Sequence, residues 1–268
     1  LTTRSARLIQ HHEIDPARIL AVTFTNKAAG EMKDRIARLI DRTPSGMWVG
    51  TFHAVGARML RREAQLVGRT SGFTIYDEDD SLGVVRRIIE RLRISPKEWT
   101  PKALRSAISG AKNALVTPEE YAKLAMDPLS KAASLVYDQL EPTLRESNAV
   151  DFDDLLVLPV RVLQQNPERV AAYRARFRFL LVDEYQDTNR AQYEFVKLPA
   201  GGDGNVLVVG DDDQSIYGWR GADIRNILAF ERDFPSAAVV RLEDNYRSTP
   251  QVLDLANAGE IFIHPMAV

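Results

Sequence analysis

Short apolar runs alternate with longer amphipathic segments in the first and last thirds of the chain. Runs rich in β-branched and aromatic residues, which are typical of buried strands, occur at residues 19–24, 48–52, 73–76, 177–182, 205–209 and 238–242. Several are followed by segments with apolar residues at helical spacing, as at residues 27–40 and 54–67. This alternation predicts an α/β fold: a mostly parallel sheet with helices on its faces.

Residues 77–176 have a different pattern, with no convincing strand and several helical segments separated by prolines. Some of these prolines stand where helices start, as Pro118 does after Thr117 and Pro167 after Asn166. An all-helical insertion inside an α/β domain is the simplest explanation. We therefore expect residues 78–176 to interrupt a domain formed by residues 1–77 and 177–268.

Composition limits the classes of function without choosing among them. The 268 residues are 45% hydrophobic and 27% charged, as in a soluble globular protein, and the net charge of −2 does not indicate a nucleic-acid binder, although a local basic groove could exist. The absence of cysteine excludes disulfides, thiolate zinc sites and cysteine nucleophiles, and is compatible with a reducing cytosol. No apolar run approaches the roughly 18 residues of a membrane span.

The most informative stretch, residues 179–188, places two carboxylates directly after an apolar run. Ligands of open α/β sheets bind beyond the carboxyl ends of the strands. Asp183 and Glu184 are therefore candidates for the acidic pair of a nucleotide site, in which the aspartate holds Mg²⁺ and the glutamate takes a proton from the attacking water. The alternative is a pair of solvated acids before a helix that Asp187 or Thr188 caps.

The end of the next strand, at residues 210–222, carries a mixture of polar and aromatic side chains that is poor core material. Gln214 can orient a water or a phosphate, and Tyr217 and Trp219 can stack on bases, which contributes about 1–3 kcal/mol per base. Arg247, after the last predicted strand, can meet a phosphate with a planar fork. The alternatives are a half-buried loop anchor for Trp219 and a surface ion pair for Arg247.

Two strand ends nearer the N-terminus offer contacts to a phosphate backbone. The hydroxyl of Thr51 and the N–H groups of the following helix can contact phosphates, and Phe24 could stack on a base. A core position for Phe24 and a satisfied loop histidine at position 53 remain open alternatives. The arginines of the following helix are interpreted as a solvated face: Arg58, Arg61 and Arg62.

Together these peptides resemble the UvrD/Rep/PcrA-like superfamily 1 DNA helicases. The matching stretches, in the family's order, are AVTFTNKAAGEM, GTFHAVGARML, DFDDLL, LLVDEYQDTNRAQ, VVGDDDQSIYGWRGA and LEDNYRSTPQVLDLAN. The resemblance implies a RecA-like domain of the P-loop NTPase type, called 1A, at residues 1–77 and 177–268, and an inserted helical domain, called 1B, at residues 78–176. It also implies an ATP-dependent 3′→5′ DNA helicase or translocase of the bacterial cytoplasm. ATP and Mg²⁺ would be its cofactors, and its partners would be single-stranded DNA, single-strand/duplex junctions and repair or replication proteins, with no membrane.

The same resemblance implies roles for individual residues. Asp183 would bind Mg²⁺ and Glu184 would be the general base. Gln214 would sense the γ-phosphate and Arg247 would contact it. The path of the single strand would be lined by Phe24, Thr51, His53, Tyr217, Trp219 and Arg220. Residues 151–155 match a family segment, to which we assign a structural role.

The sequence also departs from the family's pattern. It contains no Gly-Lys-Ser or Gly-Lys-Thr, so the phosphate-binding loop is missing, and so are the second RecA-like domain and its arginine. Because residues 1–7 read like the middle of an amphipathic helix, we expect a piece of a longer helicase that cannot turn over ATP efficiently by itself. The alternatives are a non-catalytic module that binds single-stranded DNA or a partner protein, and a related protein that acts on RNA. The tail after Asn257 does not continue the expected helical pattern.

Overall fold

The computed structural model describes residues 1–201, 204–211, 214–215, 222–223, 225–228, 230–242, 248–252 and 254. By its internal contacts the chain divides into two compact units, residues 1–234 and residues 235–268. The candidate site and the helical insertion both belong to the first unit.

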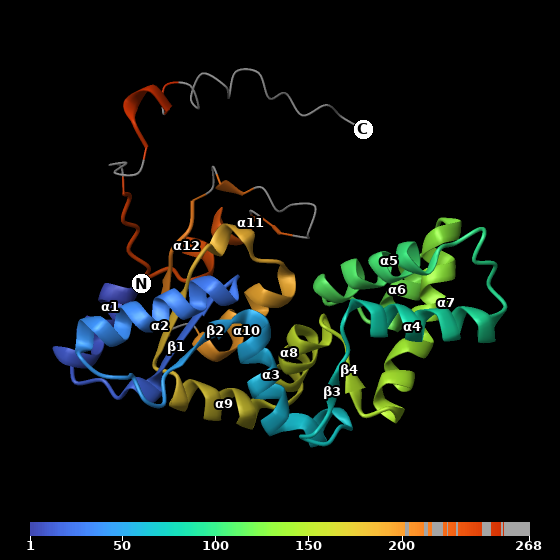
Figure 1. Ribbon diagram of the computed structural model, residues 1–268, viewed down its shortest axis with the longest axis horizontal. Helices are drawn as coiled ribbons and strands as arrows, with labels where there is room; N and C mark the ends of the chain where they lie inside the picture. The colour runs from blue at the N-terminus through green and yellow to red at the C-terminus, as the bar shows by residue number, and fades with distance from the viewer. Residues whose placement is uncertain are drawn as a thin grey trace. The chain divides into compact units, whose positions relative to one another are not determined.

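A parallel sheet forms the centre of the first unit. Its strands, in spatial order, are β2 (Trp48–Thr51), β1 (Ile19–Thr23), β5 (Phe179–Val182) and β6 (Asn205–Val208). Val22 is aligned with Val182 and Thr23 with Thr51, so the carboxyl ends of these strands meet at one edge (Figure 1). Every residue of β1 is buried, as expected for a central parallel strand that is covered on both faces. The predicted α/β fold with a parallel sheet is confirmed.

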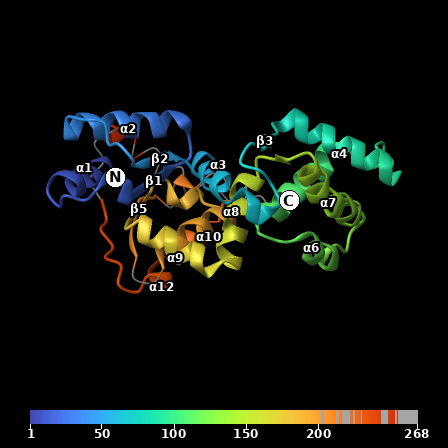
Figure 2. The same ribbon diagram turned by 90° about the horizontal axis from the view of Figure 1, so that it is seen from below.

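Helices cover both faces of this sheet. They are α1 (Thr2–Gln10), α2 (Asn26–Ile40), α3 (Phe52–Glu63), α8 (Asp154–Gln165), α9 (Pro167–Arg176), α10 (Arg190–Ala200), and the short α11 (Arg225–Leu228) and α12 (Phe230–Asp233). Figure 2 shows α1 and α2 on one face and α9 and α10 on the other. The start of α2 is fixed by Thr25, whose hydroxyl oxygen accepts a hydrogen bond from the N–H of Ala28 at 3.1 Å. None of the described helices is both long and apolar enough to cross a membrane.

The segment between two short strands is helical and has a core of its own. The strands β3 (Thr74–Ile75) and β4 (Ala149–Val150) pair in parallel. Between them lie α4 (Glu78–Leu92), α5 (Pro101–Asn113), α6 (Pro118–Leu124) and α7 (Pro128–Glu146), which Figure 1 shows beside α3 and α8. Their buried residues, among them Val84, Ile108 and Val136, form one apolar cluster. Proline occupies the first turn of α5, α6 and α7, where its fixed φ favours a helix start.

Three sequence-based expectations for this region and its surroundings were wrong. Strand β4 lies in a stretch that we expected to contain none, because two paired residues leave no periodic pattern. Pro142 and Pro159 lie inside α7 and α8 and do not separate helices. The helix α10 is capped by Asn189, whose side chain accepts from the N–H of Gln192, and not by Asp187 or Thr188.

The strand predicted at residues 238–242, in the second unit, is also wrong. These residues have no strand conformation, and Val239, Val240 and Leu242 are exposed by 59, 79 and 88%. A run of β-branched residues forms a strand only where another strand and an apolar cover are available. No such partner is found for it among the described residues of the second unit.

Candidate nucleotide and nucleic-acid site

Asp183 and Glu184 lie just beyond the carboxyl end of β5. The N–H of Asp183 donates to the carbonyl oxygen of Val22 at 3.0 Å, which holds the turn against β1. Glu184 has a φ of 51°, in the left-handed region that non-glycine residues rarely adopt, and its side chain is exposed. Strain of this kind is concentrated at functional sites. The turn therefore presents both acidic residues at the edge where the strand ends meet.

The pKa of the Asp183 carboxyl is raised from its ordinary value by burial and by the charge of Glu184. Both causes disfavour the ionised carboxylate, so a cation bound beside Asp183 would stabilise it. An acidic pair at the carboxyl end of a strand therefore suits a Mg²⁺–phosphate ligand.

Gln186 is a functional candidate that the sequence analysis missed. Its Nε2 donates to Oε2 of Glu184 at 2.9 Å, and its Oε1 accepts from the backbone N–H of Asp211 at 3.1 Å. The side chain is only 1% exposed, so it is held in place by packing. Gln186 therefore orients the Glu184 carboxylate and ties it to the loop after β6. The sequence did offer a signal for this role. Gln186 follows Glu184 by two residues, so its amide can reach the Glu184 carboxylate in a tight turn.

Gln214 joins the same network from the loop after β6. Its Nε2 donates to Oδ2 of Asp211 at 2.6 Å, and its side chain is exposed. Hydrogen bonds thus connect Gln214 to Glu184 through Asp211 and Gln186. Four further residues predicted for the site lie outside the described residues: Tyr217, Trp219, Arg220 and Arg247.

The acidic residues fit a magnesium ion that is held mainly by a nucleotide. Mg²⁺ in nucleotide sites is bound by one or two carboxylates together with phosphates and water. In the described part of the chain no group of three or more acidic or histidine residues is arranged to hold a metal. Asp183 supplies one carboxylate, and Oδ1 of Asp187 is buried without a hydrogen-bond partner among the described residues. Such an oxygen can accept a hydrogen bond or contact a cation.

The residues predicted for the DNA path follow β1 and β2 at the same edge. Thr51 is buried, with 7% exposure, and caps α3, because its Oγ1 accepts from the N–H of Ala54 at 3.1 Å. Phe24 is partly exposed and meets the buried ring of Phe52 edge-on, with 5.4 Å between centroids. Of these two aromatic residues, Phe52 is core and Phe24 reaches the surface.

His53 is stacked on a residue that the sequence analysis assigned only to structure. Its ring lies 3.9 Å from that of Phe152, with 22° between the planes. Phe152 is 52% exposed, whereas burial lowers the pKa of His53 to about 4, so the imidazole is neutral near pH 7. Two parallel, uncharged rings at the surface form a platform on which a base can stack. No local pattern in the sequence marks residue 152 as a neighbour of His53. Only the fold shows that the two rings meet.

A buried ionic cluster holds the segment that carries Phe152. Nζ of Lys112, from α5, lies 2.6 Å from Oδ2 of Asp151 and 2.7 Å from Oδ1 of Asp154. The two aspartates also accept hydrogen bonds from each other's backbone N–H groups. All three residues are buried, which agrees with the structural role predicted for residues 151–155, except that Phe152 points outward.

Asn113, next to this ionic cluster, connects it with the helix that follows Asp183 and Glu184. Its Nδ2 donates to Oδ1 of Asp153 at 3.0 Å, and its Oδ1 accepts from Nδ2 of Asn189 at 2.7 Å. Asn189 is the N-cap of α10. One amide therefore joins the helical insertion, the Phe152 segment and the acidic edge.

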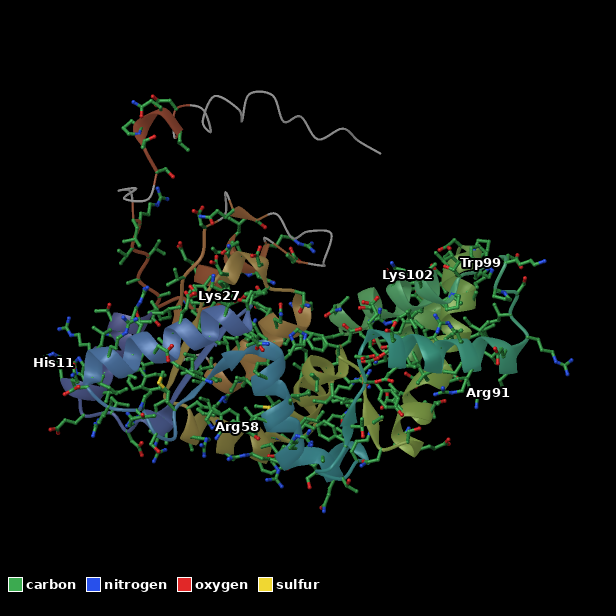
Figure 3. All side chains as sticks on the ribbon, in the orientation of Figure 1. His11, Lys27, Arg58, Arg91, Trp99 and Lys102 are labelled. Carbon is green, nitrogen blue, oxygen red and sulfur yellow. The ribbon has the colours of Figure 1, made fainter. Side chains whose placement is uncertain are left out.

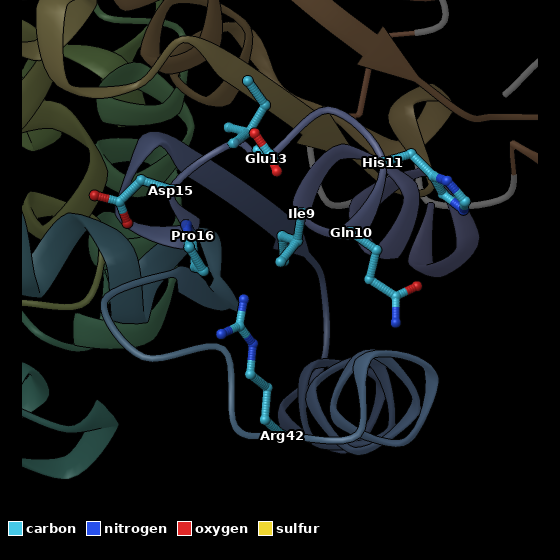
Figure 4. Close-up of a pocket in the computed structure, with 8 residues that line it drawn as sticks. Ile9, Gln10, His11, Glu13, Asp15, Pro16 and Arg42 are labelled. Atoms are coloured by element: carbon cyan, nitrogen blue, oxygen red, sulfur yellow. The ribbon is translucent and has the colours of Figure 1, made fainter.

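A hollow of about 700 Å³ lies elsewhere, at the end of α1 (Figure 4). Ile9, Pro16 and Arg42 line it, and Arg42 points into it from the end of α2. Pro16 comes shortly before β1, so the hollow lies at the amino edge of the sheet, opposite Asp183. We assign it no role in the chemistry.

Comparisons with known proteins agree with this geometry. A family model described as the UvrD/REP helicase N-terminal domain matches residues 1–235. The chain belongs to the UvrD/REP helicase family. The ATP-dependent DNA helicase PcrA of Leuconostoc citreum is 46% identical over 259 residues, which cover 96% of this chain and 35% of that protein. The PcrA proteins of Staphylococcus epidermidis and Staphylococcus aureus are 45% and 44% identical over 257 residues, with the same coverage. The chain thus spans about a third of the length of these relatives. The family resemblance seen in the sequence is confirmed.

Proposed function

We propose that this chain is the N-terminal part of an ATP-dependent DNA helicase that moves 3′→5′ along single-stranded DNA. The observation that carries the proposal is the shared register of the strands, since Asp183, Thr51 and His53 all follow strands that end at one edge. A nucleotide and a nucleic acid bound there would lie side by side. The direction of movement is taken from the family.

At the nucleotide, Asp183 would hold Mg²⁺ and Glu184 would accept the proton of the attacking water. The bound ion would neutralise charge on the phosphates. Gln186 would keep the Glu184 carboxylate in position, and Gln214 would respond to the γ-phosphate through the hydrogen bonds that link it to Glu184. Arg247 would contribute a guanidinium to the same phosphate.

Along the DNA, the platform of His53 and Phe152 would stack on a base, and Phe24 would supply a second ring. Tyr217, Trp219 and Arg220 would continue the path, and Thr51 would donate to a phosphate. Aromatic stacking is tolerant of sequence, as a translocating enzyme requires. The partners would be single-stranded DNA, single-strand/duplex junctions and repair or replication proteins in the bacterial cytoplasm.

For the domains, we propose a RecA-like domain 1A at residues 1–77 and 177–268 and a helical domain 1B at residues 78–176. The separate apolar cluster of α4, α5 and α7 supports an independent helical body. Helices α8 and α9 fall within residues 78–176 but pack against domain 1A. Helix α8, for example, packs on α3 and α10. These two helices would attach domain 1B firmly to domain 1A.

A non-catalytic module that binds single-stranded DNA or a partner protein is the second candidate. The 268 residues contain no Gly-Lys-Ser or Gly-Lys-Thr. We propose that the 268-residue polypeptide binds DNA without turning over ATP. Steady hydrolysis by this polypeptide that Glu184→Gln abolishes would refute that statement.

The DNA path is tested by Trp219→Ala. The affinity for fluorescent oligo-dT should fall roughly 5- to 100-fold, the loss of one stacked base, while the circular dichroism spectrum stays unchanged. An affinity equal to that of the parent chain would remove Trp219 from the path. RNA of the same length, measured in parallel, tests the sugar preference that the family implies.

A further inference from the structure

Three arginines converge on one buried indole at the edge of the sheet opposite to Asp183. The guanidinium carbons of Arg58, Arg62 and Arg176 lie 4.1, 5.0 and 5.2 Å from the ring of Trp48. Trp48 is the first residue of β2, and Arg176 ends α9 just before β5, so the cluster lies at the amino edge. Figure 3 shows Arg58 on the opposite side of the sheet from Lys27, which lies at the start of α2. We call these three residues the arginine cluster.

The positive charges of the arginine cluster are not neutralised within the described part of the protein. None of the three guanidiniums makes an ion pair or hydrogen bond there, and the nearby Glu63 is engaged by Arg169 at 3.3 Å and by the hydroxyl of Tyr173. Nε of Arg176 is buried with no partner in the described residues. Burial and the charges of the other two arginines lower the pKa of Arg58. Like charges held this close together favour an anion as their partner.

The stacking on Trp48 prepares these side chains for a phosphate. A guanidinium held on an aromatic face loses less rotational freedom on binding, and its N–H edge stays available for bidentate contacts to phosphate oxygens. Trp48 and Phe177 are themselves buried beneath the arginines, with 1 and 2% exposure. The surface of the cluster therefore offers charge and no aromatic anchor, whereas protein interfaces have apolar, aromatic centres. The observations favour a nucleic-acid backbone over an acidic protein.

We propose that the arginine cluster binds a phosphodiester group of nucleic acid outside the single-strand path. The four residues of β2 and β5 separate the two edges by roughly 13 Å, at about 3.3 Å per residue. An oligonucleotide that the path occupies completely leaves no phosphate for the arginines, whereas a longer strand or a duplex provides one. The cluster would thus hold nucleic acid on a second face of the same domain. The inference does not depend on the assignment of Trp219.

The test compares Arg58→Gln/Arg62→Gln with Lys33→Gln/Arg35→Gln in the full chain. The second variant removes the same charge from exposed residues of α2. Affinities for oligo-dT of about 4 and about 30 nucleotides, which bracket typical site sizes, and for a blunt duplex are measured by fluorescence anisotropy at several salt concentrations. Thermal melts establish that both variants fold.

The proposal predicts that Arg58→Gln/Arg62→Gln binds the short oligonucleotide normally. It should bind the long strand or the duplex at least about fivefold more weakly, and the slope of log K against log salt should fall by about 2, one unit per lost phosphate contact. The α2 variant should retain affinity and slope. Unchanged binding of both longer ligands, or an equal loss in the α2 variant, would overturn the proposal. Failure of the short oligonucleotide to bind the parent chain would instead count against the DNA path.

Discussion

Replacing Lys112 with methionine should destabilise the protein strongly, because it leaves two carboxylates buried without a cation. The ammonium lies within 2.7 Å of both Asp151 and Asp154, and all three side chains are largely inaccessible to water. Burial by itself acts to lower the pKa of Lys112, but the charges of the two aspartates raise it well above its ordinary value. The ammonium is therefore held in its charged form by its partners.

The magnitude follows from the burial of the cluster. Removing one partner of a buried ion pair costs about 3–5 kcal/mol, because the remaining charge is desolvated and unpaired. For a unit of this size each kcal/mol shifts Tm by about 2–4 °C. The Tm of Lys112→Met should therefore fall by roughly 6–20 °C.

The assay is thermal unfolding of the 268-residue chain followed by circular dichroism at pH 7.5. The matched control is Lys102→Met, on the same helix, whose side chain is exposed (Figure 3) and whose Tm should change by no more than about 2 °C. Combining Lys112→Met with Asp151→Asn should recover part of the loss, since one buried charge is then removed. A Tm for Lys112→Met within about 2 °C of the parent would refute the reasoning.

Three further predictions concern other parts of the protein. Burial and the charge of Asp154 raise the pKa of Asp151 against the opposing charge of Lys112. The folded state therefore holds this proton more tightly than the unfolded state, so stability should decline as the pH rises from about 4 toward neutrality, and Asp151→Asn should flatten this part of the profile of Tm against pH. Phe152→Ala should weaken oligo-dT binding about 5- to 100-fold while Phe152→Trp preserves it, and equal affinities in anisotropy titrations would exclude the platform. A Cβ at Gly56 would lie 2.0 Å from the carbonyl oxygen of Leu155 whereas one at Gly110 meets nothing within 4 Å, so Gly56→Ala should lose about 1–3 kcal/mol or more in urea unfolding and Gly110→Ala should lose none.

The order of elements around the site could be predicted from the sequence because each signal is local. The strands β1 and β5 are continuous apolar runs, and the rule that ligands bind at strand ends was enough to select Asp183 and Glu184. The same reasoning failed at residues 238–242, where the apolar run is present but a strand requires a partner that a local pattern does not reveal.

The contacts that complete the site could not be predicted, because they join residues that are far apart in the chain. Phe152 becomes a platform only against His53, and Lys112 becomes a buried cation only between Asp151 and Asp154. The arginines of α3 were interpreted as a solvated face, which is correct for their exposure but says nothing of their convergence with Arg176 on Trp48. Such pairs require the fold itself.

The most direct test of the central claim is the affinity of the 268-residue chain for oligo-dT as a function of salt concentration. The account predicts tight binding at low salt and a linear decrease of log K with log salt, because phosphate contacts at the strand ends release counterions. Absence of binding at about 50 mM salt, or an affinity that does not change with salt, would contradict a single-strand path on this domain.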